Sequence, residues 1–448
     1  MRKVTCLAAL VLAACSTTSG VRVSTTETLP PGTERIDITM GLRRDPGISA
    51  ILDEISPARI RETDSTLVSF GTRHTMSDTT STTRGIGAAR RFIYERLAEY
   101  SRECGGCLKV EYDAAMVEVT RHPQRPSVNV VNVLAWLPGR DTSRVVVIGG
   151  HYDSCVCNVD RWDVTSDAPG ADDDGSGTSA IIEIARVLSR HFPKGFDATL
   201  IFALYAGEEQ GLLGSTHLAQ RLHESHYKVA AAVTNDIIGN VVADDGRVDS
   251  TSVRIFAADP DNGPSRELGR YTWAIGALYD PAFAVMPVYR LDRIGRGGDH
   301  SPFNAMRDPA LRFTERVENY KRQHLPTDKL ADVNFRYVAN VAKLNTAALA
   351  SIAMAPAPPD SVTARRDRES GGQKWMLSWK PSDGAVSYEI LMRRTTSPMH
   401  EHVIRVPSGT QYLLTDQLDD LFASVRTVGT NGHRSLAVVI PPPVFSPR

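Results

Sequence analysis

Side chains that bind metal ions recur through the middle of this 448-residue chain, each close to the end of an apolar segment or the start of a helix. They are His151, Asp173, Glu208, Glu209, Asp236 and His324. Two histidines and three carboxylates suit a pair of divalent cations that share one bridging aspartate, and one adjacent glutamate is then spare. Because such a pair of cations activates water, this set of side chains predicts hydrolysis.

Three short apolar runs, 145–148, 200–204 and 230–233, precede most of these side chains. Each run is continuous and is followed by a glycine-rich or helix-forming segment, which is typical of buried parallel strands. His151 and Asp236 come just after two of the runs, and the two glutamates follow the third. Since ligands bind beyond the carboxyl ends of parallel strands, the runs predict one site at one edge of a sheet.

Helical segments complete the predicted core. Residues 176–192 carry apolar side chains at helical spacing, so Asp173 is expected to precede a helix that packs on the sheet. The range 48–100 is also expected to be largely helical, and the apolar stripe within 85–100 is typical of packing against a sheet. The predicted fold class is therefore α/β, a three-layer α/β/α core with a mostly parallel sheet.

Each candidate residue has an ordinary structural interpretation when it is considered alone. A histidine at a strand end is usually a satisfied polar residue, and ADDD before Gly-Ser-Gly is typical of a helix-capping turn. In the same interpretation Glu208 and Glu209 are a solvated charge pair. The whole set does not fit this structural interpretation, because five separate loops would have to end in metal-ligand residue types by coincidence.

Six motifs together resemble those of the co-catalytic zinc aminopeptidases. The motifs are HYDS at 151–154, PGADDDGSG at 169–177, GEEQGLLGS at 207–215, NDIIG at 235–239, GGDHSPF at 297–303 and HLPTD at 324–328. That family includes bacterial secreted aminopeptidases, and its superfamily contains glutamate carboxypeptidase II, the transferrin receptor and the glutaminyl cyclases. The resemblance extends from residue 48 to residue 355 and implies a peptidase that binds two zinc ions (Zn2+) per chain.

The resemblance also assigns the metal ligands. It implies that His151 and Asp236 hold one zinc ion, that Glu209 and His324 hold the other, and that Asp173 bridges the two. Asp173 is chosen because the family's bridging carboxylate is the second of the three residues that precede the glycine here.

Two further residues are candidates for roles in catalysis. Glu208 adjoins a ligand without being needed as one, so we expect it to take the proton of the attacking water and pass it to the leaving amine. Asp153 lies two residues after His151, and we expect its carboxylate to accept the second N–H of that imidazole, which fixes the ligating tautomer. The alternative for Asp153 is an ordinary turn residue.

Residues 1–14 have a basic start and an apolar stretch, the pattern of a secretory signal, and are too short to span a membrane as a helix. Residues 12–15, LAAC, resemble a bacterial lipobox, so Cys15 is the expected lipidated first residue of the mature protein. Residues 15–45 are then expected to form a polar tether. The resemblance implies a lipoprotein of the cell envelope that faces the periplasm or the outside. It favours the outer membrane, because the residue after Cys15 is not an aspartate. The alternative is plain secretion, with cleavage after Ala13 or Ala14.

Once Cys6 leaves with the leader and Cys15 takes lipid, four cysteines remain, an even number that fits an oxidising compartment: Cys104, Cys107, Cys155 and Cys157. The CGGC segment predicts a local disulfide, because no second CxxC lies near enough to complete a zinc site. The other two cysteines are not needed as metal ligands beside histidines and carboxylates. We expect them in a disulfide, either with each other or with the first pair.

The sequence changes character after residue 355. A proline-rich APAPPD segment is followed by short alternating runs separated by turn residues, which is typical of a small antiparallel β-sandwich. Residues 356–448 resemble a fibronectin type III domain, with Trp379 and Tyr388 as expected core aromatics. Three roles are open for this domain: docking on the catalytic domain of residues 46–355, binding a partner or a surface polymer, or spacing the enzyme from its anchor.

These features together predict an exopeptidase that removes N-terminal residues from peptides and contacts the membrane only through its lipid. The alternatives are a carboxypeptidase-like or dipeptide-cleaving relative, a glutaminyl cyclase, which in this superfamily uses one zinc ion, and a receptor on a decayed peptidase scaffold. A carboxylate clamp of Arg290, Arg293 and Arg296 would favour the first alternative, although such a charged loop is usually a solvated face. The formal net charge of -1 gives no electrostatic case for nucleic acid.

Overall fold

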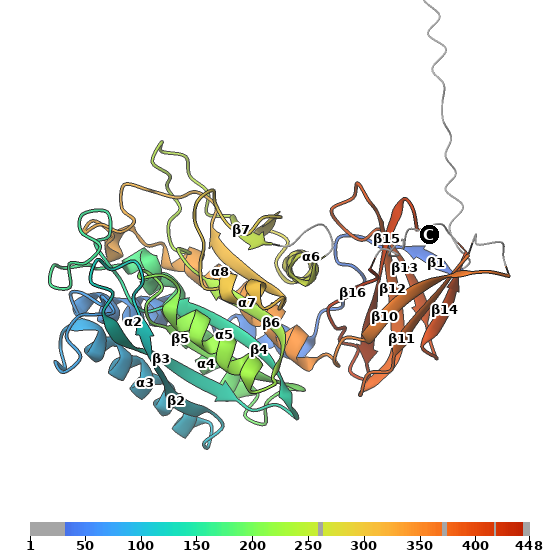
Figure 1. Ribbon diagram of the computed structural model, residues 1–448, viewed down its shortest axis with the longest axis horizontal. Helices are drawn as coiled ribbons and strands as arrows, with labels where there is room; N and C mark the ends of the chain where they lie inside the picture. The colour runs from blue at the N-terminus through green and yellow to red at the C-terminus, as the bar shows by residue number, and fades with distance from the viewer. Residues whose placement is uncertain (1–31, 259–262, 370–373, 416–417, 442–448) are drawn as a thin grey trace, which may run out of the picture.

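The computed structural model describes the chain in four stretches: 32–258, 263–369, 374–415 and 418–441. They form an α/β unit beside a smaller all-β unit (Figure 1). The predicted signal and the lipid-bearing Cys15 lie outside the described residues. Within the described stretches, every helix is too short or too polar to cross a membrane.

The α/β unit is built on an eight-stranded sheet with the strand order β2-β3-β5-β4-β6-β9-β7-β8. Its strands are β2 (Lys109–Glu118), β3 (Ser127–Leu137), β4 (Asp141–His151), β5 (Ala198–Tyr205), β6 (Lys228–Asn235), β7 (Ser252–Ala257), β8 (Ala284–Val288) and β9 (Ala310–Glu315). Strands β5, β4, β6 and β9 run parallel at the centre of the sheet. The hairpin of β2 and β3 forms one antiparallel edge, and β7 runs antiparallel to β9.

The three apolar runs predicted to be parallel strands lie within β4, β5 and β6. Every residue of β5 is buried, and β4 is buried from Arg144 onward, because helices cover both faces of the sheet there. Strand β4 pairs in parallel with β5 on one side and β6 on the other. The carboxyl ends of the three strands therefore meet along one edge, as predicted.

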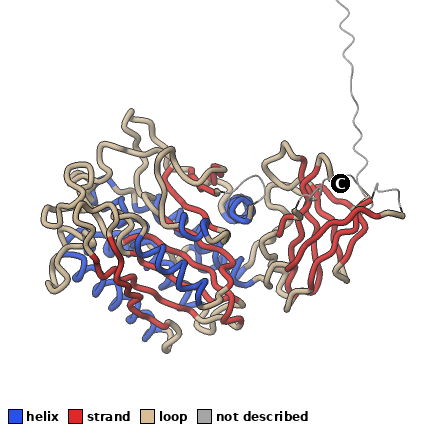
Figure 2. Tube along the Cα trace, in the orientation of Figure 1, coloured by secondary structure: helices blue, strands red, loops and turns tan. Residues whose placement is uncertain are grey.

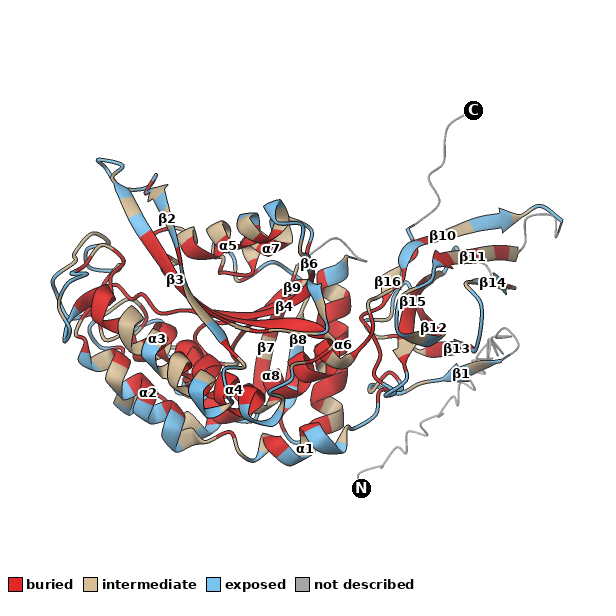
Figure 3. Cartoon of the chain, turned by 90° about the horizontal axis from the view of Figure 1, so that it is seen from below, coloured by how far each residue is buried: buried red, intermediate tan, exposed pale blue. Residues whose placement is uncertain are grey.

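Helices cover both faces of the sheet (Figures 2 and 3). One face carries α1 (Pro46–Leu52), α2 (Pro57–Ser69), α3 (Gly85–Glu103), α4 (Gly177–His191) and α8 (Phe335–Met354). The other face carries α5 (Leu213–Glu224) and α7 (Ser301–Ala305). Helix α6 (Pro264–Tyr279) packs against α8 and the β7–β8 edge. Buried apolar side chains form a separate cluster on each face, which confirms the three-layer α/β/α core.

Local sequence signals start several of these helices. Helix α2 begins at Pro57, and the Ser56 hydroxyl caps it by accepting the backbone N–H of Arg59. The Asn334 side chain caps α8 in the same way by accepting the N–H of Tyr337. Two short turns also precede helices: the π turn η1 (Ala171–Ser176) before α4 and the 3₁₀ turn η2 (Leu330–Asp332) before α8.

The C-terminal unit consists of two antiparallel sheets with the orders β10-β11-β14 and β1-β13-β12-β15-β16. Its strands are β1 (Thr33–Arg35), β10 (Asp360–Asp367), β11 (Lys374–Lys380), β12 (Ala385–Arg394), β13 (His402–Val406), β14 (Gln411–Leu414), β15 (Leu421–Gly429) and β16 (Val438–Val439). The rings of Trp379 and Tyr388 lie 5.3 Å apart in the core between the sheets. The all-β sandwich with these core aromatics was predicted and is confirmed.

Strand β1 departs from the expected polar tether of residues 15–45. It pairs antiparallel with β13, with Thr33 opposite Ile404, and the following Met40 and Leu42 are buried. The edge of β13 offers unpaired main-chain groups, and a short polar segment satisfies them without any apolar alternation in its own sequence. The described part of this segment is therefore part of the fold rather than a free linker.

The all-β unit packs on the α/β unit through α6. The Arg270 Nε donates a hydrogen bond of 2.7 Å to the carbonyl of Pro398, and the Tyr271 hydroxyl donates to the carbonyl of Arg434 at 3.2 Å. Leu391 joins the larger apolar cluster of the α/β unit together with other side chains of the sandwich. Of the three roles left open for this domain, the structure places it in a docked position.

Candidate metal centre

The carboxylate of Asp173 lies between two histidines from different loops. Its Oδ1 is 3.2 Å from Nε2 of His151, and its Oδ2 is 3.1 Å from Nε2 of His324. Each histidine also faces a second carboxylate: Asp236 Oδ1 lies 3.8 Å from His151, and Glu209 Oε2 lies 3.3 Å from His324. Asp173 therefore belongs to two groups at once, which is the position of a bridging ligand.

These contacts have the geometry of metal ligands. The potential ligand atoms within each group of three lie within 4.8 Å of one another. Two ligand atoms on a tetrahedral zinc ion, each at its usual bond length, lie about 3.3 Å apart. Three buried atoms of the groups, His151 Nε2, Asp173 Oδ2 and Glu209 Oε1, have no hydrogen-bond partner among the described residues. Histidine and carboxylate donors with vacant lone pairs suit zinc.

The loop that carries Asp173 is held in place by two other aspartates. The carboxylate of Asp328 accepts the backbone N–H groups of Asp172 and Asp173, both at 2.9 Å. The carboxylate of Asp174 accepts the N–H of His151 at 3.1 Å and that of Gly177, at the start of α4, at 2.9 Å. These bonds fix the bridging residue relative to β4 and α4.

Asp236 is held from the other side by an arginine of β9. The Arg312 Nη2 lies 2.9 Å from Asp236 Oδ1, and its Nη1 lies 2.8 Å from Asp292 Oδ2. Burial alone would raise the pKa of Asp236, but the Arg312 guanidinium and His151 outweigh burial and bring that pKa to about 2. Asp236 is therefore ionised and oriented for a cation at any physiological pH.

The imidazole of His151 lies close to two oxygens of Asp153, the residue expected to orient it. The Nδ1 of His151 lies 3.1 Å from the carbonyl oxygen of Asp153 and 3.6 Å from its Oδ1, so the carbonyl is the closer acceptor. The Asp153 carboxylate instead accepts the backbone N–H groups of Glu208 and Glu209, both at 3.3 Å, and the Thr75 hydroxyl. Both oxygens come from one residue, and the carboxylate turns toward the loop after β5 because that loop presents two N–H donors.

The ionisation of the remaining groups follows their surroundings. Burial, reinforced by neighbouring carboxylates, raises the pKa of Glu208 to about 7. The charge of Glu209 raises the pKa of His324 to about 10. Burial opposes ionisation of Asp173, but His324 and His151 outweigh it and hold the pKa of that carboxyl well below its usual range. The Glu208 carboxyl on the cavity wall is thus poised to exchange a proton near neutrality.

A cavity of about 510 Å³ opens beside the two groups. Its charged lining consists of Asp173, Glu208, Glu209, Asp236, His324, Arg121, Arg161, Arg296 and Arg312. The structure therefore brings Glu208 and four of the five predicted ligands onto one cavity wall, and it places the fifth, His151, directly behind Asp173 and Asp236. A substrate in this cavity would meet the carboxylates and any bound metal together.

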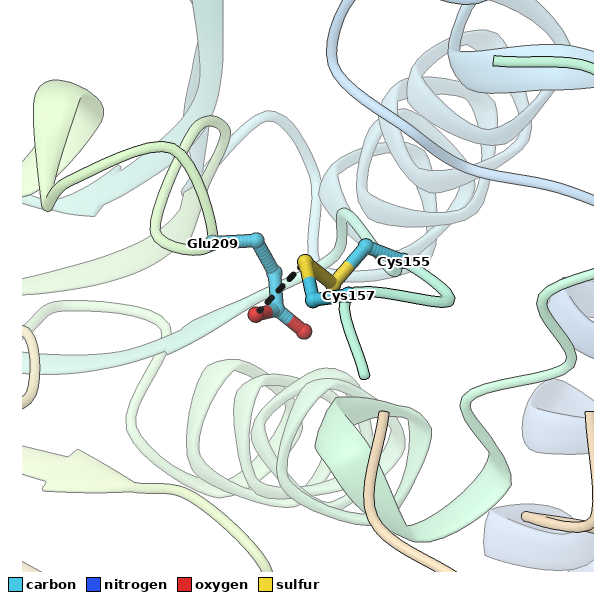
Figure 4. Close-up of side chains that lie close together, drawn as sticks. All are labelled: Cys155, Cys157 and Glu209. Carbon is cyan, nitrogen blue, oxygen red and sulfur yellow. Dashed lines mark hydrogen bonds between the residues drawn. A yellow bond between two sulfur atoms is a disulfide. The ribbon is translucent and has the colours of Figure 1, made fainter. Parts of the chain in front are cut away.

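The four described cysteines form the local pairs Cys104–Cys107 and Cys155–Cys157. The second disulfide lies beside the metal centre, with the Cys157 Sγ 3.9 Å from Oε2 of Glu209 (Figure 4). Two free thiols here, together with Glu209, would be close enough to share a metal ion. The disulfide occupies both sulfurs, so neither one is a thiolate ligand.

Several residues of the centre were not singled out from the sequence. Arg312 is the one cation in β9, and its partner Asp292 lies in a charged loop, so no local pattern linked either residue to Asp236. The charged loop that contains Arg293 and Arg296 was interpreted from the sequence as a solvated face, but these two arginines have different surroundings in the structure. Arg293 pairs with Asp292 at 3.0 Å, whereas Arg296 lines the cavity.

Comparison with known proteins agrees with this geometry. The model of peptidase family M28 matches residues 132–349. A "Probable zinc metalloprotease" of Pyrenophora teres f. teres is 38% identical over 426 residues, which cover 88% of this chain and 86% of the relative.

Two solved structures share the fold. LapA aminopeptidase of Legionella pneumophila is 24% identical with a TM-score of 0.55, and the match covers 70% of this chain and 76% of LapA. Glutaminyl cyclase of Porphyromonas gingivalis is 19% identical with a TM-score of 0.50, and the match covers 66% of this chain and 97% of the cyclase. The identity to the metalloprotease extends over nearly the whole chain, so this protein belongs to the zinc metalloproteases of peptidase family M28.

Proposed function

We propose that this metalloprotease is an aminopeptidase that uses two zinc ions to remove N-terminal residues from peptides. The observation that supports it most is the shared carboxylate of Asp173, whose two oxygens face two complete sets of ligand atoms. A site for one metal ion, as in the cyclase alternative, has no use for the second set. The receptor alternative would require a lost ligand or a lost Glu208, and all six side chains are present.

The reaction follows from the positions of the side chains. Bound zinc ions supply Lewis acidity for the scissile carbonyl and an acidified water molecule. Glu208, with a pKa of about 7 in the metal-free protein and a place on the cavity wall, takes the proton of the attacking water and returns it to the leaving amine. Asp153 keeps Glu208 and Glu209 in place through their backbone N–H groups.

The preference for a free N-terminus rests on charge. Carboxylates and metal ions together receive an α-amine and the carbonyl next to it. The fold shared with LapA, itself an aminopeptidase, is consistent with this direction of attack. Carboxypeptidase-like or dipeptide cleavage is the main alternative, because arginines also line the cavity.

The deciding experiment compares an aminoacyl anilide with its N-acetylated twin, using protein reconstituted with zinc. The free-amine substrate should be hydrolysed and the blocked one should not. Equal cleavage of both would refute the aminopeptidase assignment. Elemental analysis of the same sample should give close to two zinc equivalents per chain, and full activity with one equivalent would favour the cyclase alternative.

Two proposals concern the rest of the chain. Lipidation of Cys15 after removal of residues 1–14 would anchor the enzyme in the bacterial envelope, in the outer membrane on its periplasmic or outer face. Cell fractionation of a Cys15→Ser variant tests this, and unchanged membrane association would exclude it.

We further assign residues 46–355 to the catalytic domain and 356–448 to a fibronectin type III-like domain. The two-sheet strand order supports the second assignment.

A further inference from the structure

Besides Arg312, three arginines line the cavity of the metal centre, each from a separate segment of the chain. Arg121 lies in the turn between β2 and β3, Arg161 in the loop that follows β4, and Arg296 in the loop between β8 and α7. Arg121 is exposed, and the other two are partly buried. Their arrival at one cavity from distant parts of the sequence is the starting observation.

None of the three forms an ion pair with a carboxylate in the described stretches of the chain. Arg161 Nη1 donates a hydrogen bond of 2.8 Å to the carbonyl oxygen of Glu209, and Arg296 Nη1 donates one of 2.9 Å to Gln323 Oε1. These neutral acceptors hold the two guanidinium groups in place without cancelling their charge. Arg312, on the same cavity wall, is by contrast saturated by two aspartates.

The charge balance of the cavity makes these cations significant. Four carboxylates line it, and two zinc ions carry an equal and opposite charge. The positive charge of the three arginines then remains uncompensated in the cavity. A guanidinium group recognises a carboxylate through two parallel N–H donors, and this interaction is stronger than a neutral hydrogen bond.

We propose that Arg121, Arg161 and Arg296 form a subsite for a carboxylate of the substrate, so that the enzyme selects anionic peptides. This inference rests on the proposed aminopeptidase function and specifies its substrate class. Two carboxylates on a peptide have the required chemistry: the side chain of an acidic residue and the C-terminal carboxylate of a very short peptide. In either case the carboxylate lies away from the scissile bond, which remains at the metal centre.

Two matched pairs of substrates distinguish an acidic side chain from a C-terminal carboxylate as the group that the subsite binds. The first pair is the anilide of glutamate and that of glutamine, which differ only in side-chain charge. The second pair is leucyl-glycine and leucyl-glycinamide, which differ only at the C-terminus. We expect kcat/KM to favour the anionic member of at least one pair by about tenfold, through KM, and the preference should shrink as salt is added.

Arginine variants test the residues themselves. In Arg121→Gln and Arg296→Gln the preference should fall toward unity, and Arg296→Lys should recover part of it because the charge is restored. The matched control is Arg290→Gln, which removes an exposed arginine just outside the cavity and should leave the preference unchanged. An equal fall in the control would refute the assignment to these residues.

A binding measurement makes the result independent of turnover. Calorimetric titration of the zinc-loaded protein with glutamate and with glutamine should give tighter binding of glutamate in the wild type, and the difference should be reduced in Arg296→Gln. Equal binding, together with equal cleavage within both pairs, overturns the subsite. If leucine anilide is still cleaved in that case, the aminopeptidase function stands, whereas failure to cleave any free-amine substrate refutes that function instead.

Discussion

Arg312 and Asp236 form an ion pair of 2.9 Å in which the side chains are only 1% and 5% exposed. A buried charge is costly unless it is paired, so the arginine and the carboxylate fix each other in place. The pair extends to Asp292 on the other side of the guanidinium group. The position of the proposed metal ligand Asp236 therefore depends on Arg312, which is not itself a proposed ligand.

Replacing Arg312 by glutamine should weaken zinc binding at the His151 side of the centre. Removing such a supporting contact lowers metal affinity or activity by about 10–100-fold in other metal sites. Competition with a chelator would measure this as loss of one zinc equivalent before the other. Arg247→Gln, which breaks an exposed pair with Asp245, is the control and should leave the zinc content unchanged.

The Glu208→Gln variant should keep both zinc ions and the fold but lose turnover, because an amide cannot carry a proton. Loss of a positioned acid/base group lowers rates by about 10²–10⁴-fold. Steady-state kinetics beside elemental analysis would show this combination. Glu224→Gln, an exposed change at the end of α5, should behave like the wild type. Wild-type turnover in Glu208→Gln would exclude Glu208 as the base.

Zinc uptake at neutral pH should release protons. The pKa of His324 is raised to about 10, chiefly by the charge of Glu209, so its imidazole is protonated at pH 7 without metal. Only the neutral imidazole binds zinc, so affinity should rise with pH by about tenfold per unit for each proton displaced. Calorimetry in two buffers of different ionisation enthalpy measures the protons. Identical heats in the two buffers would contradict the protonated state.

The contact between the two domains should depend on Glu267. This buried carboxylate lies 2.7 Å from Arg270 and 2.9 Å from His400 of the sandwich. Burial alone would raise the pKa of Glu267, but contacts with His400 and Arg270 outweigh it and bring the pKa to about 2. Replacement of Glu267 by glutamine leaves a buried cation without its partner and should cost about 3–5 kcal/mol in the free energy of unfolding.

The same carboxylate sets a pH dependence. Folding lowers the pKa of Glu267, so its contribution to the free energy of unfolding is complete above the unfolded pKa of about 4.3. That contribution is lost as the pH falls toward the folded pKa of about 2. Denaturant unfolding at a series of acidic pH values would show a steeper loss in the wild type than in Glu267→Gln. Glu34→Gln is the control, because both side chains of its pair with Arg405 are more than half exposed. Parallel curves for wild type and Glu267→Gln would refute the prediction.

The parts of the structure that were predictable from the sequence are those set by local pattern. The residues of β5 are buried throughout and mostly apolar because both faces of the sheet are covered. Glu208 and Glu209 follow directly after this strand, so their place at the edge of the sheet was predictable. The contact of Arg312 with Asp236 was not predictable in this way. It requires β9 to lie beside β6 with Thr234 opposite Arg312, a register that only the assembled sheet specifies.

The role of Asp153 shows a second limit of sequence reasoning. Its spacing from His151 places both its carbonyl and its carboxylate near the imidazole, and spacing alone does not distinguish them. The choice is made by the backbone N–H groups of Glu208 and Glu209, which lie far away in the sequence. Strand β1 was missed for a related reason, because three polar residues acquire strand geometry only from the edge of β13.

The pairing of β1 with β13 makes the sandwich a discontinuous domain. Its first strand precedes the whole α/β unit in the chain, and its remaining strands follow that unit, so the α/β unit is an insertion between them. During synthesis the catalytic sheet can be completed while β1 still lacks its partner, and the sandwich closes only after residues near the C-terminus have emerged. A fragment that begins at residue 356 would leave β1 behind and expose the edge of β13 to pairing with other chains.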